Sequence, residues 1–332
     1  MLAGVDRTDA ADRPATATSA DAPEALDTPG TGAPAAWLAA AAREIDVDGY
    51  LRRLGIDRRP EQADVATLRR LHRAQVERIA YENLDIQLGR HRSIDPRASV
   101  GHVLAGRGGY CYALNGAFSL LLTALGYRVT WHRAGVQGHA APEPPGPALA
   151  NHLALTVDGL PAAEAPDGAW LVDAGLGDAI HEPVPLRTGT HQQGPLTFGL
   201  RPSEVAPGGW RLDHDPRGSF VGMDFGPAAA TVDDFLERDT FLSTAPKSGF
   251  VRTSIVQRRD AGGSDQLRGC LLTRVDARPE PGERLVDTEE EWFEALVDVF
   301  GLALPDLDGA DRRRLWARVR AGHDQWVAEQ AP

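Results

Sequence analysis

The stretch RGGYCYALNGAFSLLLTALG, residues 107–126, predicts a helix that begins at one of only two cysteines in the chain. After Cys111 the apolar residues recur at helical spacing, and Gly126 is a predicted stop; they are Leu114, Phe118, Leu121, Leu122 and Leu125. A thiol in the first turn of a helix lies near the positive end of the helix dipole, which favours the thiolate. Gly108 and Gly109 allow backbone N–H groups to approach a substrate carbonyl. The stretch indicates either a nucleophile or a small buried core residue, and its neighbours must decide.

Composition narrows the classes of protein. The chain has 332 residues, of which 42% are hydrophobic and 25% charged, as in a globular protein with a large core. A net charge of −12 and a pI near 5.3 argue against nucleic-acid binding. We expect no membrane-spanning helix, no signal peptide and no metal site, because the apolar runs are short and the two cysteines lack metal-ligand spacing. A reducing, cytoplasmic location is expected.

The N-terminal part of the chain predicts a tail followed by helices. Residues 1–43 are rich in Ala, Asp, Thr, Pro and Gly and predict a disordered N-terminal tail, in which Trp37 and Leu38 begin a short Ala-rich helix. Residues 44–126 predict a helical bundle that contains the cysteine helix. Within it, residues 64–88 show continuous helical periodicity, with Asp64 as the expected N-cap.

Periodicity changes after Gly126. Residues 127–136 and 151–159 alternate between apolar and polar, and residues 169–179 form an apolar strand that stops at Asp173 in a Gly-rich turn. Residues 127–229 therefore predict an antiparallel β-barrel. Residues 230–332 predict an α/β lid with helices at 231–244, 287–302 and 311–327 and strands at 249–259 and 269–277. The fold class is α+β.

A histidine and an aspartate later in the chain are candidates to act with Cys111 in catalysis. His152 lies on one face of a predicted strand, and Asp173 closes the next strand, so neighbouring antiparallel strands bring them within hydrogen-bond reach. A nucleophilic cysteine needs a base, and the base needs an orienting acid, so Cys111, His152 and Asp173 are candidates for a catalytic triad. The alternatives are a core histidine with satisfied hydrogen bonds and an aspartate that forms a turn.

The sequence resembles the arylamine N-acetyltransferase family over residues 46–300. The matching segments, in order, are YLRRLGI, TLRRLHRAQVERIAYENLDIQLG, RGGYCYALN, NHLALTV, WLVDAGLGDA and FLSTAPKSGFVRTSIVQRR. The resemblance implies a helical bundle, a β-barrel and an α/β lid around a cysteine-protease-like core. It also implies a Cys111–His152–Asp173 triad and ping-pong transfer of acetyl from acetyl-CoA, as co-substrate, to an arylamine, hydrazine or similar small-molecule amine. A permanently bound cofactor is not implied.

The resemblance also implies supporting and binding residues. Glu82 and Arg107 are expected near the triad, with Gly109 and Tyr110 beside the thiol. The segment Gly175, Leu176 and Gly177 is expected to border the acyl and CoA pocket. Thr244 and Ser248 are expected near CoA, although a turn with solvated polar residues is equally consistent with the sequence there.

Several positions depart from the family pattern. Ala113 replaces the glutamate that usually stands two residues after the cysteine, which would leave Arg107 without a partner or with Glu82 alone. Ala80 and Tyr81 replace a common Pro-Phe pair. In the lid, the usual Asn and His are not evident around Asp239, Thr240 and Ala245.

These departures keep other functions open. Macrolactam-forming amide synthases resemble the same family and take a polyketide chain from an acyl carrier protein. A binding protein without turnover and a cysteine peptidase are further alternatives. Outside the candidate site, Cys270 and the helix-spaced residues Trp292, Phe293, Leu296, Val297 and Phe300 predict core packing, and Arg312 to Arg314 predict a solvated helix face.

Overall fold

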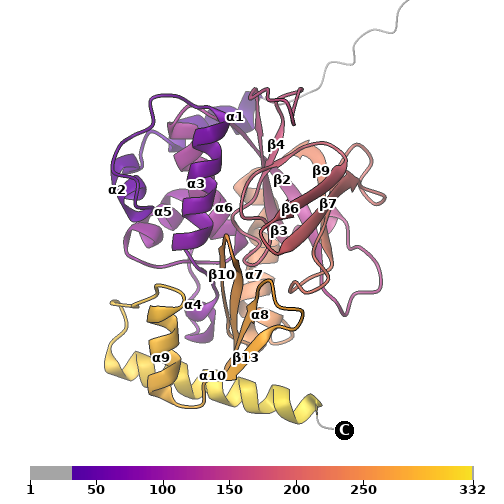
Figure 1. Cartoon of the computed structure of the whole chain (residues 1–332). Helices are drawn as coiled ribbons and strands as arrows, with labels where there is room; N and C mark the ends of the chain where they lie inside the picture. Colours follow the sequence, from indigo (N-terminus) through magenta and orange to yellow (C-terminus); the bar gives the residue numbers. More distant parts are fainter. Residues whose placement is uncertain (1–31, 331–332) are drawn as a thin grey trace, which may run out of the picture.

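A computed structural model describes residues 32–330 (Figure 1). The predicted tail over residues 1–43 lies mostly outside the described residues. The short Ala-rich helix expected from Trp37 is present as helix α1, which begins earlier and spans Gly32–Ala41. Leu38 and Ala41 are buried. The ring of Trp37 packs edge-on against Trp131, with centroids 5.7 Å apart. Burial of this apolar side of α1 favours the ordered helix.

The N-terminal helices are α2 (Val47–Arg53), α3 (Val65–Arg78), α4 (Leu84–Gln87), α5 (Pro96–Leu104) and α6 (Cys111–Ala124). Asp64 is the N-cap of α3, as predicted, and its Oδ1 accepts a hydrogen bond from the Thr67 N–H at 2.7 Å. A single helix over residues 64–88 was wrong. The chain becomes extended at Ile79, and Tyr81–Glu82 form strand β1, which pairs with β10. A long-range strand partner therefore overrides the helical periodicity.

The middle of the chain forms an eight-stranded antiparallel sheet that curls into a nearly closed barrel, with β5 and β6 at its edges and strand order β5-β4-β3-β2-β9-β8-β7-β6. The strands are β2 (Arg128–Gln137), β3 (His152–Asp158), β4 (Trp170–Val172), β5 (Val184–Pro185), β6 (Gly189–Gln193), β7 (Leu196–Pro202), β8 (Trp210–Asp213) and β9 (Gly222–Ala229). A short 3₁₀ turn, Pro147–Leu149, precedes β3. In Figure 1 this barrel stands beside the N-terminal helices.

The C-terminal region forms a second antiparallel sheet in the order β1-β10-β11-β12-β13. Its elements are a 3₁₀ turn (Val232–Phe235), α7 (Leu236–Thr244), α8 (Gly249–Arg252), β10 (Ile255–Asp260), β11 (Gly263–Arg268), β12 (Leu271–Val275), β13 (Gly282–Leu285), α9 (Glu289–Asp298) and α10 (Gly309–Gln330). A strand over all of residues 249–259 was wrong, because Ser248 caps the short helix α8 before β10 begins. Strand β1 joins this sheet from the N-terminal part, which brings Glu82 beside β10.

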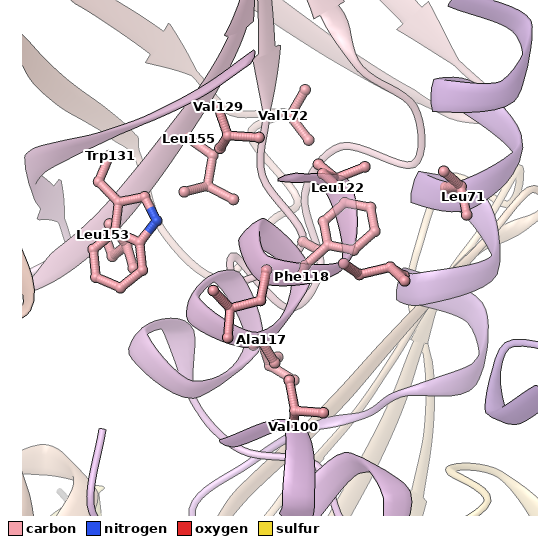
Figure 2. Packing of buried hydrophobic residues seen from close by; sticks show 14 of the residues in the cluster. Leu71, Val100, Ala117, Phe118, Leu122, Val129, Trp131, Leu153, Leu155 and Val172 are labelled. Atoms are coloured by element: carbon pink, nitrogen blue, oxygen red, sulfur yellow. The ribbon is translucent and has the colours of Figure 1, made fainter. Parts of the chain in front are cut away.

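The core of the molecule is organised around α6. Figure 2 shows its residues Ala117, Phe118 and Leu122 among side chains from two helices and three strands: Leu71, Val100, Val129, Trp131, Leu153, Leu155 and Val172. Almost every residue of α6 is buried. The α+β fold is as predicted, and the burial of α6 from both sides fixes the place of its first residue, Cys111.

Candidate active site

The turn before α6 is tightly packed. Cys111 is 3% exposed and is the first residue of the helix. A Cβ atom on Gly108 would lie 2.0 Å from the Ala80 carbonyl oxygen, so this position requires glycine. The Gly109 carbonyl accepts a hydrogen bond from the Glu82 N–H at 3.0 Å. These contacts fix the backbone from which the thiol projects.

The imidazole and carboxylate that the sequence selected are in direct contact. His152 begins β3, which pairs with β4, and Asp173 follows the last residue of β4. Nε2 of His152 lies 2.7 Å from Oδ2 of Asp173, and both residues are buried. Burial alone would lower the pKa of His152, but the charges of Asp173 and Cys111 and hydrogen bonds to both outweigh it and raise the pKa to about 10. The imidazolium form is therefore stabilised next to the thiol.

Asn115 holds Asp173 in place and was missed as a site residue by the sequence analysis. Its Nδ2 donates to Oδ1 of Asp173 and to the Leu153 carbonyl, both at 2.7 Å, and its Oδ1 accepts from the Ala174 N–H at 2.9 Å. The signal was present, because Asn115 stands four residues after Cys111 and so lies on the same helix face.

The loop after Asp173 packs directly on the cysteine. A Cβ atom on Gly175 would lie 2.9 Å from Cα of Cys111. Gly177 has φ +73°, and a Cβ atom there would meet Gln257 Oε1 at 2.1 Å. Leu176, between them, is buried. Of the residues expected to border an acyl pocket, Gly175 lies against the cysteine. Contact of these residues with an acyl group or with CoA stays a prediction.

Arg107 has more partners than the sequence suggested. The expectation that it would be left alone or with Glu82 alone was wrong. Its guanidinium lies 3.2 Å from Glu82, 3.0 Å from Asp85 and 2.8 Å from Asp306. Arg107 and Glu82 are both buried, so the mutual ion pairs offset their desolvation. The sequence analysis missed both aspartates: Asp85 lies in a matching segment but nothing marked it as a partner of Arg107, and Asp306 lies outside every matching segment.

Ala113 leaves open space beside the turn. It lines a small cavity together with Gly109, Tyr110, Ser243 and ten further residues, which include Arg90 and Arg92. About 40 Å³ of this cavity is open to a molecule the size of water. That space is large enough for a water molecule.

The two lid residues differ in their surroundings. Ser248 is buried, and its hydroxyl donates to the Leu242 carbonyl at 2.7 Å and accepts from the Phe250 N–H at 3.2 Å. Thr244 is exposed, and its hydroxyl donates to the Thr240 carbonyl at 2.6 Å. These local bonds account for both hydroxyl groups, and a CoA contact by either residue stays a prediction.

Residues 32–330 carry no arrangement typical of a metal site or of a membrane-spanning helix. Within that range, no cluster of three or more His, Cys, Asp or Glu side chains is arranged to hold a metal ion. None of the helices described there is long and apolar enough to cross a membrane.

The buried Cys–His–Asp arrangement is suited to acyl transfer through a thiol, and comparison with known proteins defines the family. A family model described as N-acetyltransferase matches residues 64–308. The chain therefore belongs to this N-acetyltransferase family.

Relatives in this family carry a more specific name. Arylamine N-acetyltransferase 2 of Mesocricetus auratus is 26% identical over 286 residues, which cover 78% of this chain and 95% of that protein. Arylamine N-acetyltransferase 2 of Homo sapiens is 26% identical over 288 residues, with the same coverage.

Solved structures with a similar fold carry the same enzyme name. The arylamine N-acetyltransferase from Mycobacterium abscessus has a TM-score of 0.72 and 28% identity, covering 84% of this chain and 96% of that one. The Mycobacterium marinum enzyme in complex with CoA has a TM-score of 0.72 and 28% identity, covering 83% of this chain and 99% of that one.

Proposed function

We propose that this protein is an arylamine N-acetyltransferase that moves an acetyl group from acetyl-CoA to an arylamine, hydrazine or similar amine. One observation carries the proposal: His152 is held by Asp173 at 2.7 Å in a site that also contains Cys111 at the start of a helix. The names of the relatives and the CoA complex of the Mycobacterium marinum enzyme support this choice of substrates.

In the first half-reaction the Cys111 thiolate attacks the carbonyl carbon of the acetyl thioester. A carbon–sulfur bond to Cys111 forms, and the bond to the CoA sulfur breaks. The imidazolium of His152 gives its proton to the departing CoA thiolate. Asp173 keeps the imidazole oriented and stabilises its charged form, with Asn115 holding Asp173. The product of this step is acetyl-Cys111 and free CoA.

In the second half-reaction the amine attacks acetyl-Cys111. The neutral imidazole of His152 takes a proton from the amine nitrogen, the new carbon–nitrogen bond forms, and the Cys111 sulfur leaves as the thiolate. The N-acetylated amine is released, and the thiolate–imidazolium pair is restored. Because one site serves both halves, the kinetics are ping-pong.

The start of α6 supplies the charge stabilisation that both steps need. The carbonyl oxygen becomes negative in each tetrahedral intermediate, and the N–H groups of a helix's first turn are the natural donors to it. Tyr110, at the N-cap position, does not use its side chain to cap the helix. Arg107 and Glu82 support the turn. Their ion pair and the hydrogen bond from the Glu82 N–H to the Gly109 carbonyl join the turn to strand β1.

Intact mass spectrometry tests the proposal. The protein is incubated with acetyl-CoA without acceptor, beside the Cys111→Ser variant. We expect one acetyl adduct that maps to Cys111, that is absent from the variant and that is discharged by an arylamine. An adduct from a longer acyl thioester but not from acetyl-CoA would instead favour an amide synthase fed by a carrier protein. Failure of every thioester to form an adduct excludes both transferase functions. Because the thiol must stay reduced, we also propose a cytoplasmic location.

A further inference from the structure

Tyr110, the residue before Cys111, is bound through its hydroxyl to the C-terminal region. The hydroxyl donates a hydrogen bond to Oδ1 of Asp239 on α7. The other oxygen, Oδ2 of Asp239, lies 2.9 Å from Nε2 of His91. Asp239 is 2% exposed. This buried carboxylate therefore joins the turn before Cys111, helix α7 and the loop after α4.

The contact is strong for a physical reason. A carboxylate loses much of its hydration when it is buried, so it is retained only where partners replace the water. Each oxygen of Asp239 has such a partner, and the bond from Tyr110 is a charge-assisted hydrogen bond to one of them. Loss of the Tyr110 hydroxyl would leave that oxygen buried with no compensation from this side.

The ring of Tyr110 is held as well as its hydroxyl. It packs edge-on against Phe250 of α8, with centroids 5.5 Å apart, and against Tyr112, at 5.6 Å. The Phe250 carbonyl in turn accepts hydrogen bonds from the side chains of Asn83 and Gln87. With its ring confined on two sides, Tyr110 has one position in which its hydroxyl reaches Asp239.

The turn before Cys111 is thus fixed at both ends by carboxylates from the C-terminal region. Asp306 binds Arg107 at 2.8 Å, and Asp239 binds Tyr110. We propose that Asp239 is a positioning residue, which acts through Tyr110 to keep the Cys111 thiol aligned with His152. The inference rests on the proposed role of Cys111 as the nucleophile, and it adds to that role a dependence on α7.

Four variants test the contact, and a fifth is the control. Asp239→Ala and Tyr110→Phe each remove it, and each is expected to slow acetylation of Cys111 by about tenfold, the size of one lost hydrogen bond to a charged group. The double variant should be no slower than the worse single one, because both changes remove the same interaction. Asp239→Asn keeps an acceptor for Tyr110 and should restore most of the rate. Glu237→Ala, at an exposed position on the same helix, is the matched control.

A pH profile separates alignment from a general loss of structure. Alkylation of Cys111 by a small neutral reagent is measured against pH, and thermal unfolding confirms that each variant folds. In Asp239→Ala and Tyr110→Phe, we expect the reactivity of the wild type at low pH to weaken and the profile to move toward that of free cysteine, near ~8.5. If the wild type is reactive and both variants match its profile and rate, Asp239 is not a positioning residue. If the wild type itself is neither acetylated nor reactive at low pH, the proposed function fails, and this inference fails with it.

Discussion

The two cysteines of this chain are both buried, yet their surroundings are opposite. Cys111 is 3% exposed and stands at the start of a helix beside His152. Cys270 is fully buried in the C-terminal core, in the same apolar cluster as Trp292 and Leu296. Burial raises the pKa of the Cys270 thiol to about 11. A low exposed fraction therefore does not by itself decide whether a buried thiol can act as a nucleophile.

What distinguishes them is the set of polar groups that reaches the sulfur. At Cys111 an imidazole is held by a carboxylate, which is itself held by an amide, so each group orients the next. At Cys270 the neighbouring side chains are mostly apolar, and a thiolate would be poorly stabilised. A candidate nucleophile should therefore be judged by whether a base lies beside its sulfur and whether further side chains hold that base in position.

The largest expected effect is a loss of acetyl transfer when Cys111, but not Cys270, is replaced. Cys111→Ala should lower acetyl transfer on the order of 10⁴-fold or more, since it removes the group that we propose to form the covalent intermediate. Cys270→Ala should leave kcat within about twofold, because Cys270 belongs to a different hydrophobic cluster from Cys111. Steady-state assays with acetyl-CoA and an arylamine compare the two. Similar losses in both variants would contradict the assignment of Cys111.

Removal of the carboxylate behind His152 should have the next largest effect. Asp173→Asn keeps the shape but loses the charge and the preferred imidazole tautomer, so we expect kcat to fall on the order of 10³-fold. Asp178→Asn is the matched control. Asp178 is also buried and lies in the same loop, but its oxygens accept from the Ser219 N–H at 2.7 Å and hydroxyl at 2.8 Å. Equal losses in these two variants would refute a special role for Asp173.

A smaller loss is expected for Asn115→Ala. The change removes the hydrogen bond from Nδ2 of Asn115 to Oδ1 of Asp173, and we expect kcat to fall by about 10- to 100-fold. Ser119→Ala, on the same helix, is the control, because its hydroxyl donates only to the Gly116 carbonyl, at 2.7 Å. The two rates and the unfolding temperatures are measured together. A variant that is equally active but less stable would make Asn115 a purely structural residue.

The pH dependence of stability sharpens the contrast, because it reports the charge that lies beside Cys111. The pKa of His152 is raised from its ordinary 6.5 to about 10. Its contribution to stability is therefore full below pH ~6.5 and is lost as the pH rises through about 10. The unfolding temperature of the wild type should fall across this window. His152→Asn should show a flatter profile, and a profile equally steep in both proteins would contradict the raised pKa.

The smallest effect concerns Cys270 alone. Cys270→Ala deletes one buried sulfur from a packed core, which should lower the free energy of unfolding by about 1 kcal/mol. Chemical denaturation measures the change. A loss near zero would show that the core closes around the alanine, and a much larger loss would reveal a polar role for the thiol.

The geometry of the candidate site was largely predictable because its main residues lie on regular elements. The Gly-Gly turn and the helical spacing predicted the helix that begins at Cys111, and the alternation around His152 with the strand end at Asp173 predicted their contact. Each of these signals is local in the sequence. The contact between His152 and Asp173 follows from the pairing of β3 with β4, because consecutive strands usually lie side by side.

The parts that were missed depend on partners far away in the sequence. The local sequence at Tyr81–Glu82 predicts helix, but pairing with strand β10 makes this segment a strand. Likewise Asp306 reaches Arg107 from the C-terminal region, and no local pattern marks it. Side-chain contacts between distant segments are decided by packing in three dimensions, which periodicity does not encode.

The order of the groups along the chain has a consequence for biosynthesis. Cys111 leaves the ribosome before His152 and Asp173, and well before Asp239 and Asp306, are synthesised. Until those residues fold onto the turn, the nascent chain carries an ordinary thiol at this position. If Cys111 is the nucleophile that we propose, its reactivity toward thioesters requires the folded protein, and we expect a truncated chain that lacks these segments not to be acylated.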